Sequence, residues 1–269
     1  MNKNQLTAIV IFDIDGVIRD VGNSYRRAIA DTVKHFTDGA WRPTMEDLDN
    51  LKSEGIWNND WEASQELIYR YFEAQDKTRD EIELDYDYPQ GTLRDRIVDF
   101  FQERYRGKHP ELFDGYIADE PLLISPGYFK QLNENKIGYG FFSGATRGSA
   151  EFVIKQRLKL DNPVLVAMGD APSKPDPQGM FDTISQIEAD CDNTPAFYLG
   201  DTVADMYTVA RAREIDPQRQ WIGVGILPPH VQISPTRQAD YAQKLMAAGA
   251  EIVLSNVEKL DLKMIEELI

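Results

Sequence analysis

Two aspartates separated by a single residue follow an apolar stretch near the start of the chain. The stretch, residues 6–12 (LTAIVIF), is apolar and partly β-branched, as is typical of a strand buried on both faces of a parallel sheet. Asp13 and Asp15 come next, and Gly16 then allows a sharp change of chain direction. Two carboxylates this close repel each other unless a cation or a shared proton relieves them. They are therefore candidates for cation binding or acid–base chemistry, although such a pair also occurs in ordinary surface turns.

A serine and a lysine stand in comparable places later in the chain. Ser143 and Gly144 follow the apolar run 137–142, where a hydroxyl and the backbone amides at the start of a helix could hold a phosphate group. Lys174 lies in the segment Ser-Lys-Pro-Asp-Pro, whose two prolines restrict the backbone, and an ammonium held in this way can neutralise an anion. Taken alone, neither segment requires a functional role. The first could be an ordinary serine–glycine turn, and the second a rigid loop with an exposed lysine.

A second pair of aspartates follows the apolar run 196–199. Asp201 stands where a strand should end, and Asp205 comes one helical turn later on the same side of the following helix. Carboxylate oxygens suit a hard cation such as Mg²⁺. The alternative is that Asp201 only caps the helix.

Apolar runs of strand length alternate with helical patterns along most of the chain. The runs span residues 6–12, 137–142, 164–168, 196–199, 221–226 and 251–254, and the helical patterns span about 146–159, 178–189, 202–213, 236–248 and 257–268. This alternation predicts βαβ units with right-handed crossovers and a parallel sheet. Ligands bind such sheets outside the carboxyl ends of the strands. The segments with chemically active side chains therefore converge on one edge of the predicted sheet.

Residues 19–114 interrupt this alternation with a helical pattern. Apolar residues between 25 and 36 recur at helical spacing, and Ser24 in front of them is a suitable N-cap. Thr44 with Asp47 resembles a capping box at the start of another helix. No strand pattern is visible in this part of the sequence.

Further helices are expected over residues 60–76 and 92–106, whereas the acid-rich stretch 80–88 is interpreted as a solvated loop. The sequence therefore predicts an α/β core formed by residues 1–18 and 115–269. The helical domain, residues 19–114, is inserted into this core directly after its first strand.

The composition excludes several classes of protein. The 269 residues include 29 lysines and arginines against 45 aspartates and glutamates, which gives a net charge of −16. A surface this acidic repels phosphate backbones and anionic lipids, which argues against nucleic acid and membrane partners. The hydrophobic fraction of 42% is too high for a disordered chain, and no apolar run approaches the roughly 20 residues of a membrane span.

Cysteine usage and the start of the chain point to the cytoplasm. Cys191 is the only cysteine and cannot form an internal disulfide, which fits a reducing compartment. Residues 1–16 contain one lysine and an apolar run soon broken by aspartates, unlike a secretory signal peptide. We therefore expect a cytoplasmic protein, with a monomer and a homodimer both open.

Together, in this order, the segments resemble the haloacid dehalogenase (HAD) superfamily. Its pattern is Asp-x-Asp-Gly on the first strand, an apolar run ending in serine or threonine, a lysine, and Gly-Asp-x-x-x-Asp, matched here by residues 13–16, Ser143, Lys174 and residues 200–205. The helical insertion resembles the C1 cap of subfamily IA, the phosphoglycolate-phosphatase-like branch. The resemblance implies an α/β fold, a Rossmann-like parallel sheet core with an inserted all-helical C1 cap domain.

By this resemblance, the chain is a Mg²⁺-dependent phosphatase that acts on a small phosphorylated metabolite. Asp13 would attack the phosphoryl group and form an aspartyl phosphate. Asp15 would protonate the leaving alcohol and then activate water. Ser143 and Lys174 would hold the phosphoryl oxygens, with Gly144 also at the substrate.

The same resemblance implies a magnesium site. Asp13, the backbone carbonyl of Asp15, and Asp201 would bind Mg²⁺, which screens the like charges of carboxylate and phosphate. Asp205 would bind the ion directly or through water.

Two positions bear on the alternatives within the superfamily. Asp15 favours phosphoryl transfer over dehalogenation, because a halide leaves without protonation. By the same resemblance, hexose phosphomutases of the C1 type carry a cap histidine about twelve residues after the nucleophile. Tyr25 takes that place in this sequence, which favours a phosphatase over a mutase. A sugar phosphomutase, a phosphonate-type hydrolase and a non-catalytic HAD-fold binding protein stay open as alternatives.

Substrate choice is expected to depend on the helical insert. Trp57, Asn58 and Asn59 lie in the segment 55–61 (GIWNNDW), where a C1 cap would place a specificity loop. They could stack on and hydrogen-bond a polyol, a sugar or a heteroaromatic ring. Equally, the tryptophans could belong to the core of the insert. Arg19 could reach anionic groups of the substrate or be a solvated surface charge.

The insert also resembles a branch of subfamily IA that occurs fused to histidine-pathway proteins. That resemblance points to histidinol phosphate as a substrate. Phosphoglycolate and sugar phosphates stay open beside it.

Overall fold

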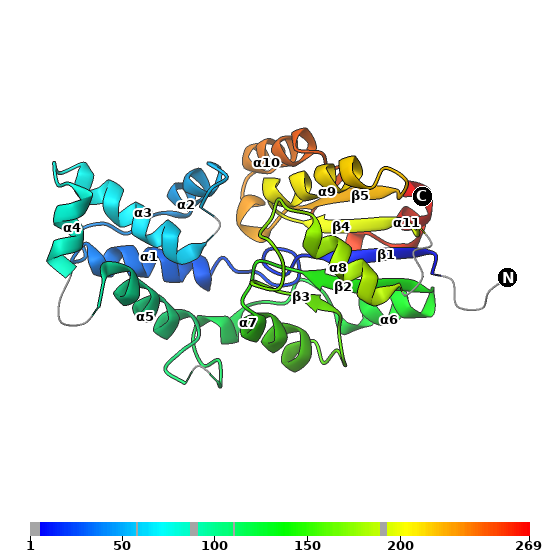
Figure 1. The fold of residues 1–269 in the computed structure, drawn as a ribbon, viewed down its shortest axis with the longest axis horizontal. Helices are drawn as coiled ribbons and strands as arrows, with labels where there is room; N and C mark the ends of the chain where they lie inside the picture. Colours follow the sequence, from blue (N-terminus) through cyan, green and yellow to red (C-terminus); the bar gives the residue numbers. More distant parts are fainter. Residues whose placement is uncertain (1–5, 58, 87–90, 110, 189–192) are drawn as a thin grey trace. The chain divides into compact units, whose positions relative to one another are not determined.

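The chain divides into two compact units (Figure 1). Met1–Asp20 and Pro121–Ile269 form the core unit, and Val21–Glu120 form the helical unit. The computed structural model describes residues 6–57, 59–86, 91–109, 111–188 and 193–269, so Asn58 and Cys191 lie outside the described residues. Within those ranges, no helix is long and apolar enough to cross a membrane.

The core unit includes the chain as far as Asp20 because Arg19 takes part in its backbone pairing. Arg19 forms a bridge with Leu122, and the N–H of Asp20 donates to the carbonyl of Pro121 at 2.8 Å. The boundaries between the units lie after residues 20 and 120, whereas the sequence predicted them after residues 18 and 114.

A six-stranded parallel sheet forms the centre of the described core unit, in the order β3-β2-β1-β4-β5-β6. Its strands are β1 (Ala8–Phe12), β2 (Ile137–Phe142), β3 (Leu165–Val166), β4 (Ala196–Gly200), β5 (Trp221–Ile226) and β6 (Ile252–Leu254). The chain adds β2 and β3 on one side of β1 and then β4, β5 and β6 on the other. β1 therefore lies where the winding reverses, the place where open α/β sheets bind ligands. The predicted Rossmann-like sheet is confirmed.

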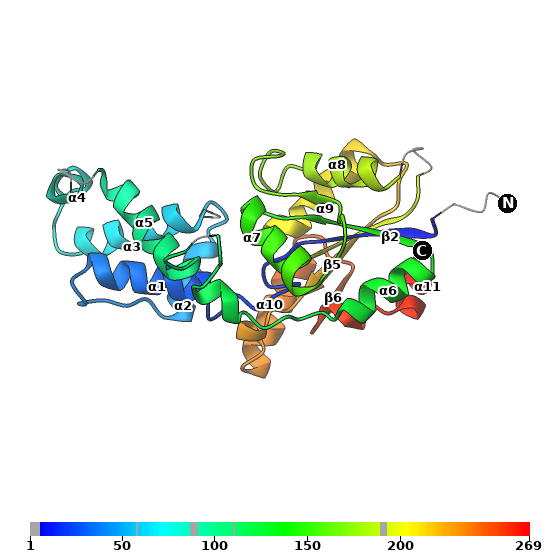
Figure 2. The same ribbon diagram turned by 90° about the horizontal axis from the view of Figure 1, so that it is seen from below.

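Helices cover both faces of the sheet, and Figure 2 shows α8 and α9 above the strands and α6 and α11 below. One layer holds α6 (Pro126–Glu134), α7 (Arg147–Glu151), the π-helical η2 (Phe152–Arg157), η4 (Val257–Lys259) and α11 (Leu262–Leu268). The other holds α8 (Gln178–Ile187) and α9 (Val203–Ile215), with η3 (Pro229–Val231) and α10 (Pro235–Ala247) beside α9. β1 is apolar throughout because Ala8, Val10 and Phe12 face one layer and Ile9 and Ile11 the other.

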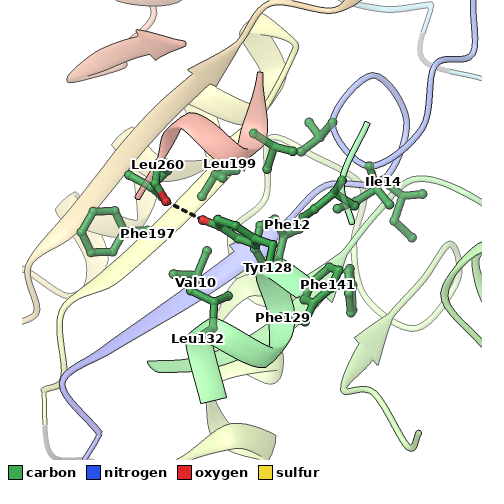
Figure 3. Packing of buried hydrophobic residues seen from close by; sticks show 14 of the residues in the cluster. Val10, Phe12, Ile14, Tyr128, Phe129, Leu132, Phe141, Phe197, Leu199 and Leu260 are labelled. Atoms are coloured by element: carbon green, nitrogen blue, oxygen red, sulfur yellow. Dashed lines mark hydrogen bonds between the residues drawn. The ribbon is translucent and has the colours of Figure 1, made fainter. Parts of the chain in front are cut away.

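Aromatic side chains fill the layer between β1, β2 and α6 (Figure 3). The ring of Phe129 lies 5.6 Å from that of Phe12 and 5.8 Å from that of Phe141, measured between centroids. Tyr128 donates its hydroxyl to the carbonyl of Leu260 at 2.7 Å, which satisfies its polar end inside an apolar layer. This packing fixes the end of β1.

The helical unit contains α1 (Tyr25–Phe36), α2 (Met45–Lys52), α3 (Asp60–Glu73), α4 (Arg79–Tyr86), α5 (Leu93–Tyr105) and η1 (Tyr116–Asp119), and no strand over its described residues. The predicted capping box of Thr44 and Asp47 is confirmed at the start of α2. Ser24 stands at the N-cap of α1, but its hydroxyl donates to the carbonyl of Val21 at 3.2 Å and makes no capping hydrogen bond.

The interpretation of residues 80–88 as a solvated loop is wrong, because α4 covers Arg79–Tyr86; residues 87 and 88 lie outside the described part. Thr78 and Glu81 form a capping box. The Glu81 carboxylate accepts from the N–H of Thr78 at 2.8 Å, and the Thr78 hydroxyl accepts from the N–H of Glu81 at 3.4 Å. Ile82 is buried and anchors the helix. Capping and one apolar contact thus outweigh the acidic composition.

Two features of the core unit differ from the expected pattern. β3 is a short strand at the edge of the sheet, shorter than the run 164–168, and the helix expected over 146–159 divides into α7 and η2. α6 was not predicted from the sequence, because its start at Pro126-Gly127 resembles a turn, although proline is favoured in the first turn of a helix.

Replacing Phe129 by alanine should destabilise the protein by about 3–5 kcal/mol, because the buried ring would leave a cavity among its aromatic neighbours. Urea-induced unfolding followed by circular dichroism measures the change. Ile233→Ala is the control, because that side chain is 73% exposed, and its effect should stay below about 0.5 kcal/mol. Similar losses in both variants would contradict the packing seen in Figure 3.

Candidate active site

The carboxyl ends of β2, β1 and β4 lie side by side. Phe12 pairs with Phe141 on one side and with Leu199 on the other. The N–H of Asp13 donates to the carbonyl of Leu199 at 2.9 Å. The backbone of Asp13 therefore still belongs to the sheet, which fixes the position from which its side chain leaves the strand end.

Asp13 is buried against a lysine. Its Oδ1 lies 2.9 Å from Nζ of Lys174. Burial disfavours the charged carboxylate and raises the pKa of Asp13 to about 6; Lys174 opposes this rise, and the carboxylates of Asp205 and Asp15 add to it. Within the described structure, the partner of this buried oxygen is the ammonium of Lys174.

Lys174 bridges two carboxylates beside an aromatic wall. Its Nζ lies 2.9 Å from Asp13 and 2.7 Å from Oδ1 of Asp205. It also lies 5.4 Å from the ring centroids of Phe142 and Tyr198, within the range of cation–π attraction. Burial by itself lowers the pKa of Lys174, but the attraction of the two carboxylates outweighs it and raises that pKa above its ordinary value. The ammonium therefore stays charged.

The carboxylate of Asp205 is surrounded by donors. Its Oδ2 accepts from the backbone N–H of Thr202 at 2.9 Å and from the Thr202 hydroxyl at 2.7 Å. Its Oδ1 faces Lys174 and accepts from the hydroxyl of Tyr198 at 3.1 Å. A carboxylate offers about four lone-pair positions, and these contacts occupy them. Gly200 permits the close approach, because a Cβ there would lie 2.2 Å from the Cβ of Asp205.

Asp201 is held between a glycine and a tyrosine. Gly16 has a φ of +78°, and a Cβ on it would lie 2.1 Å from Oδ2 of Asp201. The loop after β1 can therefore approach the buried Asp201 carboxylate only because residue 16 has no side chain. From α10, Tyr241 donates its hydroxyl to the backbone carbonyl of Asp201 at 2.9 Å.

The cluster of Asp13, Asp201 and Asp205 fits a hard divalent cation. One carboxylate oxygen of each lies within 4.8 Å of the others, and all three residues are buried. Lys174 offers one positive charge to these carboxylates. The ligand atoms offered are carboxylate oxygens, as Mg²⁺ prefers. Because Asp205 is already surrounded by donors, direct ligands would come from Asp13 and Asp201.

Asp15 pairs with Arg19. Nε of Arg19 donates to Oδ1 of Asp15 at 2.6 Å, with the Asp15 side chain 27% exposed and that of Arg19 completely buried. The N–H of Gly16 donates to the carbonyl of Arg19 at 2.9 Å and closes a tight loop. Arg19 is therefore not a solvated surface charge, and its guanidinium orients Asp15.

Ser143 directly follows β2 and is buried. Its N–H donates to the carbonyl of Val166 at 3.0 Å, and its hydroxyl oxygen accepts from the N–H of Ala145 at 3.2 Å. The hydroxyl proton is left to donate to another group. Gly144 is exposed, and no described atom lies within 4 Å of the place a Cβ would take there.

The predicted substrate contacts of the helical unit make local hydrogen bonds. Nε1 of Trp57 donates to the carboxylate of Glu54 at 2.7 Å. Asn59 is the N-cap of α3, because its side-chain oxygen accepts from the N–H groups of Trp61 and Glu62 at 3.0 and 3.3 Å. Both tryptophans are half-buried. A role of Trp57 and Asn59 toward a substrate stays a prediction.

Two residues that the sequence analysis passed over complete the site, Tyr198 and Thr202. Burial raises the pKa of Tyr198 well above its ordinary value, so its hydroxyl keeps the proton that it donates. A tyrosine in a continuous apolar strand was a signal for it, because a buried hydroxyl needs a partner. The signal for Thr202 was the capping-box spacing Thr-x-x-Asp, which α9 uses.

Replacing Gly16 by alanine should weaken Mg²⁺ binding about 10- to 100-fold, because the new Cβ would collide with the Asp201 carboxylate. Calorimetric titration with MgCl₂ measures the affinity. Gly39→Ala is the matched control: its φ is +80°, but the new Cβ would meet no described atom within 4 Å. Equal affinities in the two variants would mean that the contact with Asp201 does not shape the site.

Several solved structures share this fold. A phosphonoacetaldehyde hydrolase-like protein from Oleispira antarctica has a TM-score of 0.64 at 19% identity, over 98% of this chain and 93% of its own. A phosphatase from Thermococcus thioreducens has a TM-score of 0.59 at 22% identity, over 80% of this chain and 92% of its own. A β-phosphoglucomutase from Clostridium difficile has a TM-score of 0.58 at 14% identity, over 98% of this chain and 97% of its own. At these identities the likeness concerns the fold alone.

Sequence comparison identifies the family. The chain is 27% identical over 251 residues to an imidazoleglycerol-phosphate dehydratase from Phytophthora nicotianae. The match takes in 91% of this chain but 50% of the relative, so the chain spans about half the length of the curated relative it matches. The sequence pattern of the haloacid dehalogenase-like hydrolases matches residues 7–213, a range that contains the whole carboxylate cluster. The chain therefore belongs to the haloacid dehalogenase-like hydrolase family.

Proposed function

We propose that the protein is a Mg²⁺-dependent phosphatase that hydrolyses a small phosphorylated metabolite through an aspartyl phosphate. The observation that carries this proposal is the buried contact of Asp13 with Lys174, beside the carboxylates of Asp201 and Asp205, at the end of β1. A carboxylate attacks an anionic phosphoryl group only where positive charge offsets their repulsion. The cluster supplies one such charge and is suited to hold another.

In the first half-reaction, a carboxylate oxygen of Asp13 attacks phosphorus, and the bond between phosphorus and the ester oxygen breaks. Lys174 neutralises negative charge on Asp13 and on the phosphoryl oxygens, and the hydroxyl of Ser143 donates a hydrogen bond to one of these oxygens. Asp15, in its protonated form, gives its proton to the leaving oxygen, so that the first product is a neutral alcohol. Arg19 holds this carboxyl group in place.

In the second half-reaction, a water molecule attacks the phosphorus of the aspartyl phosphate. Asp15, now a carboxylate, takes a proton from this water. The bond between phosphorus and the oxygen of Asp13 breaks, which releases inorganic phosphate and restores the carboxylate. Lys174 again faces the charge that develops on the phosphoryl oxygens.

Asp13, the backbone carbonyl of Asp15, and Asp201 would hold the magnesium ion. When bound, Mg²⁺ screens the repulsion between the carboxylate and the phosphoryl group. We assign Asp205 an indirect role, through Lys174 or a bridging water. The donors around both of its oxygens support this assignment.

The proposed substrate is a small phosphomonoester. The Phytophthora relative is named for an imidazoleglycerol phosphate, and this chain matches half of that relative. The assay panel should therefore contain imidazoleglycerol phosphate and histidinol phosphate together with phosphoglycolate and sugar phosphates. The net charge of −16 disfavours extended polyanions as substrates.

Asp13→Asn should lower kcat at least about 10³-fold on any ester of the panel that the wild type hydrolyses, because an amide cannot act as the nucleophile. Release of inorganic phosphate in the presence of MgCl₂ measures the rate. Asp161→Asn makes the same change at an exposed position and should keep kcat within about twofold. Substantial turnover by Asp13→Asn would rule out Asp13 as the nucleophile.

Analysis of the products separates the alternatives. Release of inorganic phosphate supports the phosphatase. An isomerised sugar phosphate without phosphate release would identify a mutase instead. Mg²⁺ binding with no turnover across the whole panel would point to a binding protein.

Mg²⁺ should stabilise the folded protein, because it offsets the repulsion among Asp13, Asp201 and Asp205. At a free concentration of about 100 times Kd, the gain is about 2.7 kcal/mol. Scanning calorimetry in MgCl₂ and in EDTA measures it as a difference in Tm. Asp201→Asn should abolish most of this difference, whereas Asp161→Asn should retain it. A wild-type Tm that is equal in both solutions would argue against a magnesium site.

A further inference from the structure

The hydroxyl of Tyr198 lies between two parts of the site that come from distant segments. Tyr198 is in the middle of β4 and is fully buried. Its hydroxyl lies 3.1 Å from the carbonyl oxygen of Phe142, at the end of β2, and 3.1 Å from Oδ1 of Asp205, in the first turn of α9. With one proton, the hydroxyl donates to one acceptor at a time, and the charged carboxylate is the stronger acceptor.

The same tyrosine lines the wall beside Lys174. Its ring centroid and that of Phe142 each lie 5.4 Å from Nζ of Lys174. Oδ1 of Asp205 receives both the Tyr198 hydroxyl and the Lys174 ammonium. Thr202 holds the other oxygen, Oδ2, through its N–H and its hydroxyl. The direction in which Asp205 presents Oδ1 to Lys174 therefore depends on Tyr198 together with Thr202.

We propose that Tyr198 is a positioning residue of the phosphatase reaction, whose hydroxyl sets the place of Lys174 beside Asp13 by fixing the carboxylate of Asp205. The inference rests on the proposed function. Tyr198 acts through its neighbours and does not touch the substrate. Because Lys174 offsets charge that develops during phosphoryl transfer, displacing its ammonium slows the chemical step more than it weakens substrate binding.

Tyr198→Phe tests this inference, because it removes the hydroxyl and keeps the ring beside Lys174. If the hydroxyl served only to satisfy a buried polar group, the variant would lose stability and keep its kcat. A matched control must therefore lose a buried tyrosine hydroxyl that does not hydrogen-bond to Asp13, Lys174 or Asp205.

Tyr128 offers that control within the same unit. It is buried, and its hydroxyl donates to the backbone carbonyl of Leu260 in the layer that Figure 3 shows, on the opposite face of the sheet from Tyr198. Tyr128→Phe and Tyr198→Phe each remove one buried hydrogen-bonding hydroxyl. Thermal unfolding should show comparable decreases in Tm for the two variants.

We expect Tyr198→Phe to lower kcat about tenfold or more while KM changes by less than about threefold. Tyr128→Phe should keep both parameters within about twofold of the wild type. Phosphate release from an ester that the wild type hydrolyses gives both parameters. Equal kcat values in the two variants would overturn the inference and leave the proposed function intact.

Binding of orthovanadate in the presence of MgCl₂ provides a readout that needs neither turnover nor knowledge of the substrate. Orthovanadate resembles the transferring phosphoryl group in charge and shape, so its affinity depends on the placement of Lys174. Calorimetric titration should show about tenfold weaker binding to Tyr198→Phe than to the wild type and to Tyr128→Phe. Unchanged affinity in Tyr198→Phe would overturn the inference alone. A wild type with neither turnover nor orthovanadate binding would overturn the proposed function, and the inference with it.

Discussion

A lysine ammonium buried between two carboxylates is the interaction on which the site depends. Moving a charged group out of water costs several kcal/mol unless partners compensate it. Asp13, Lys174 and Asp205 compensate one another through contacts of 2.7 and 2.9 Å. Without Lys174, two buried carboxylates would face each other with no positive charge between them. Asp13, Lys174 and Asp205 are therefore tolerated only as a set.

The parallel sheet is what brings this set together. Its backbone groups are paired along the strands and its faces are covered by apolar layers, so polar side chains can gather only where strands end. Crowding at these ends then decides where side chains are allowed. Gly16 and Gly200 stand where a Cβ would collide with Asp201 and Asp205, respectively. These two glycines are as much a condition of the cluster as the aspartates are.

The sequence predicts the parts of this site that local pattern controls. Asp13 and Asp201 are recognisable because each follows an apolar strand, and the sheet was predictable from the same alternation. Tyr198 was not recognised, because its hydroxyl contacts residues of other segments, and within its strand it resembles any core residue. For Asn59 the sequence suggested a ligand contact and missed the cap of α3, which its side-chain oxygen forms; a role toward a substrate stays a prediction. The composition of residues 80–88 likewise concealed α4.

Charge placement, and not the charge count, governs which anions the protein can accept. The net charge of −16 belongs mostly to the surface, where salt screens it beyond about 8 Å. The cluster holds three carboxylates, two of which contact the Lys174 ammonium. With all three ionised, the two excess negative charges match one Mg²⁺. Under the proposed function, a phosphate ester would then meet a site without net repulsion and would be held by Lys174 and the hydroxyl of Ser143. An extended polyanion would lie against the acidic surface along its whole length and would be repelled. Under the proposed function, electrostatics would therefore favour small phosphate esters over nucleic acids.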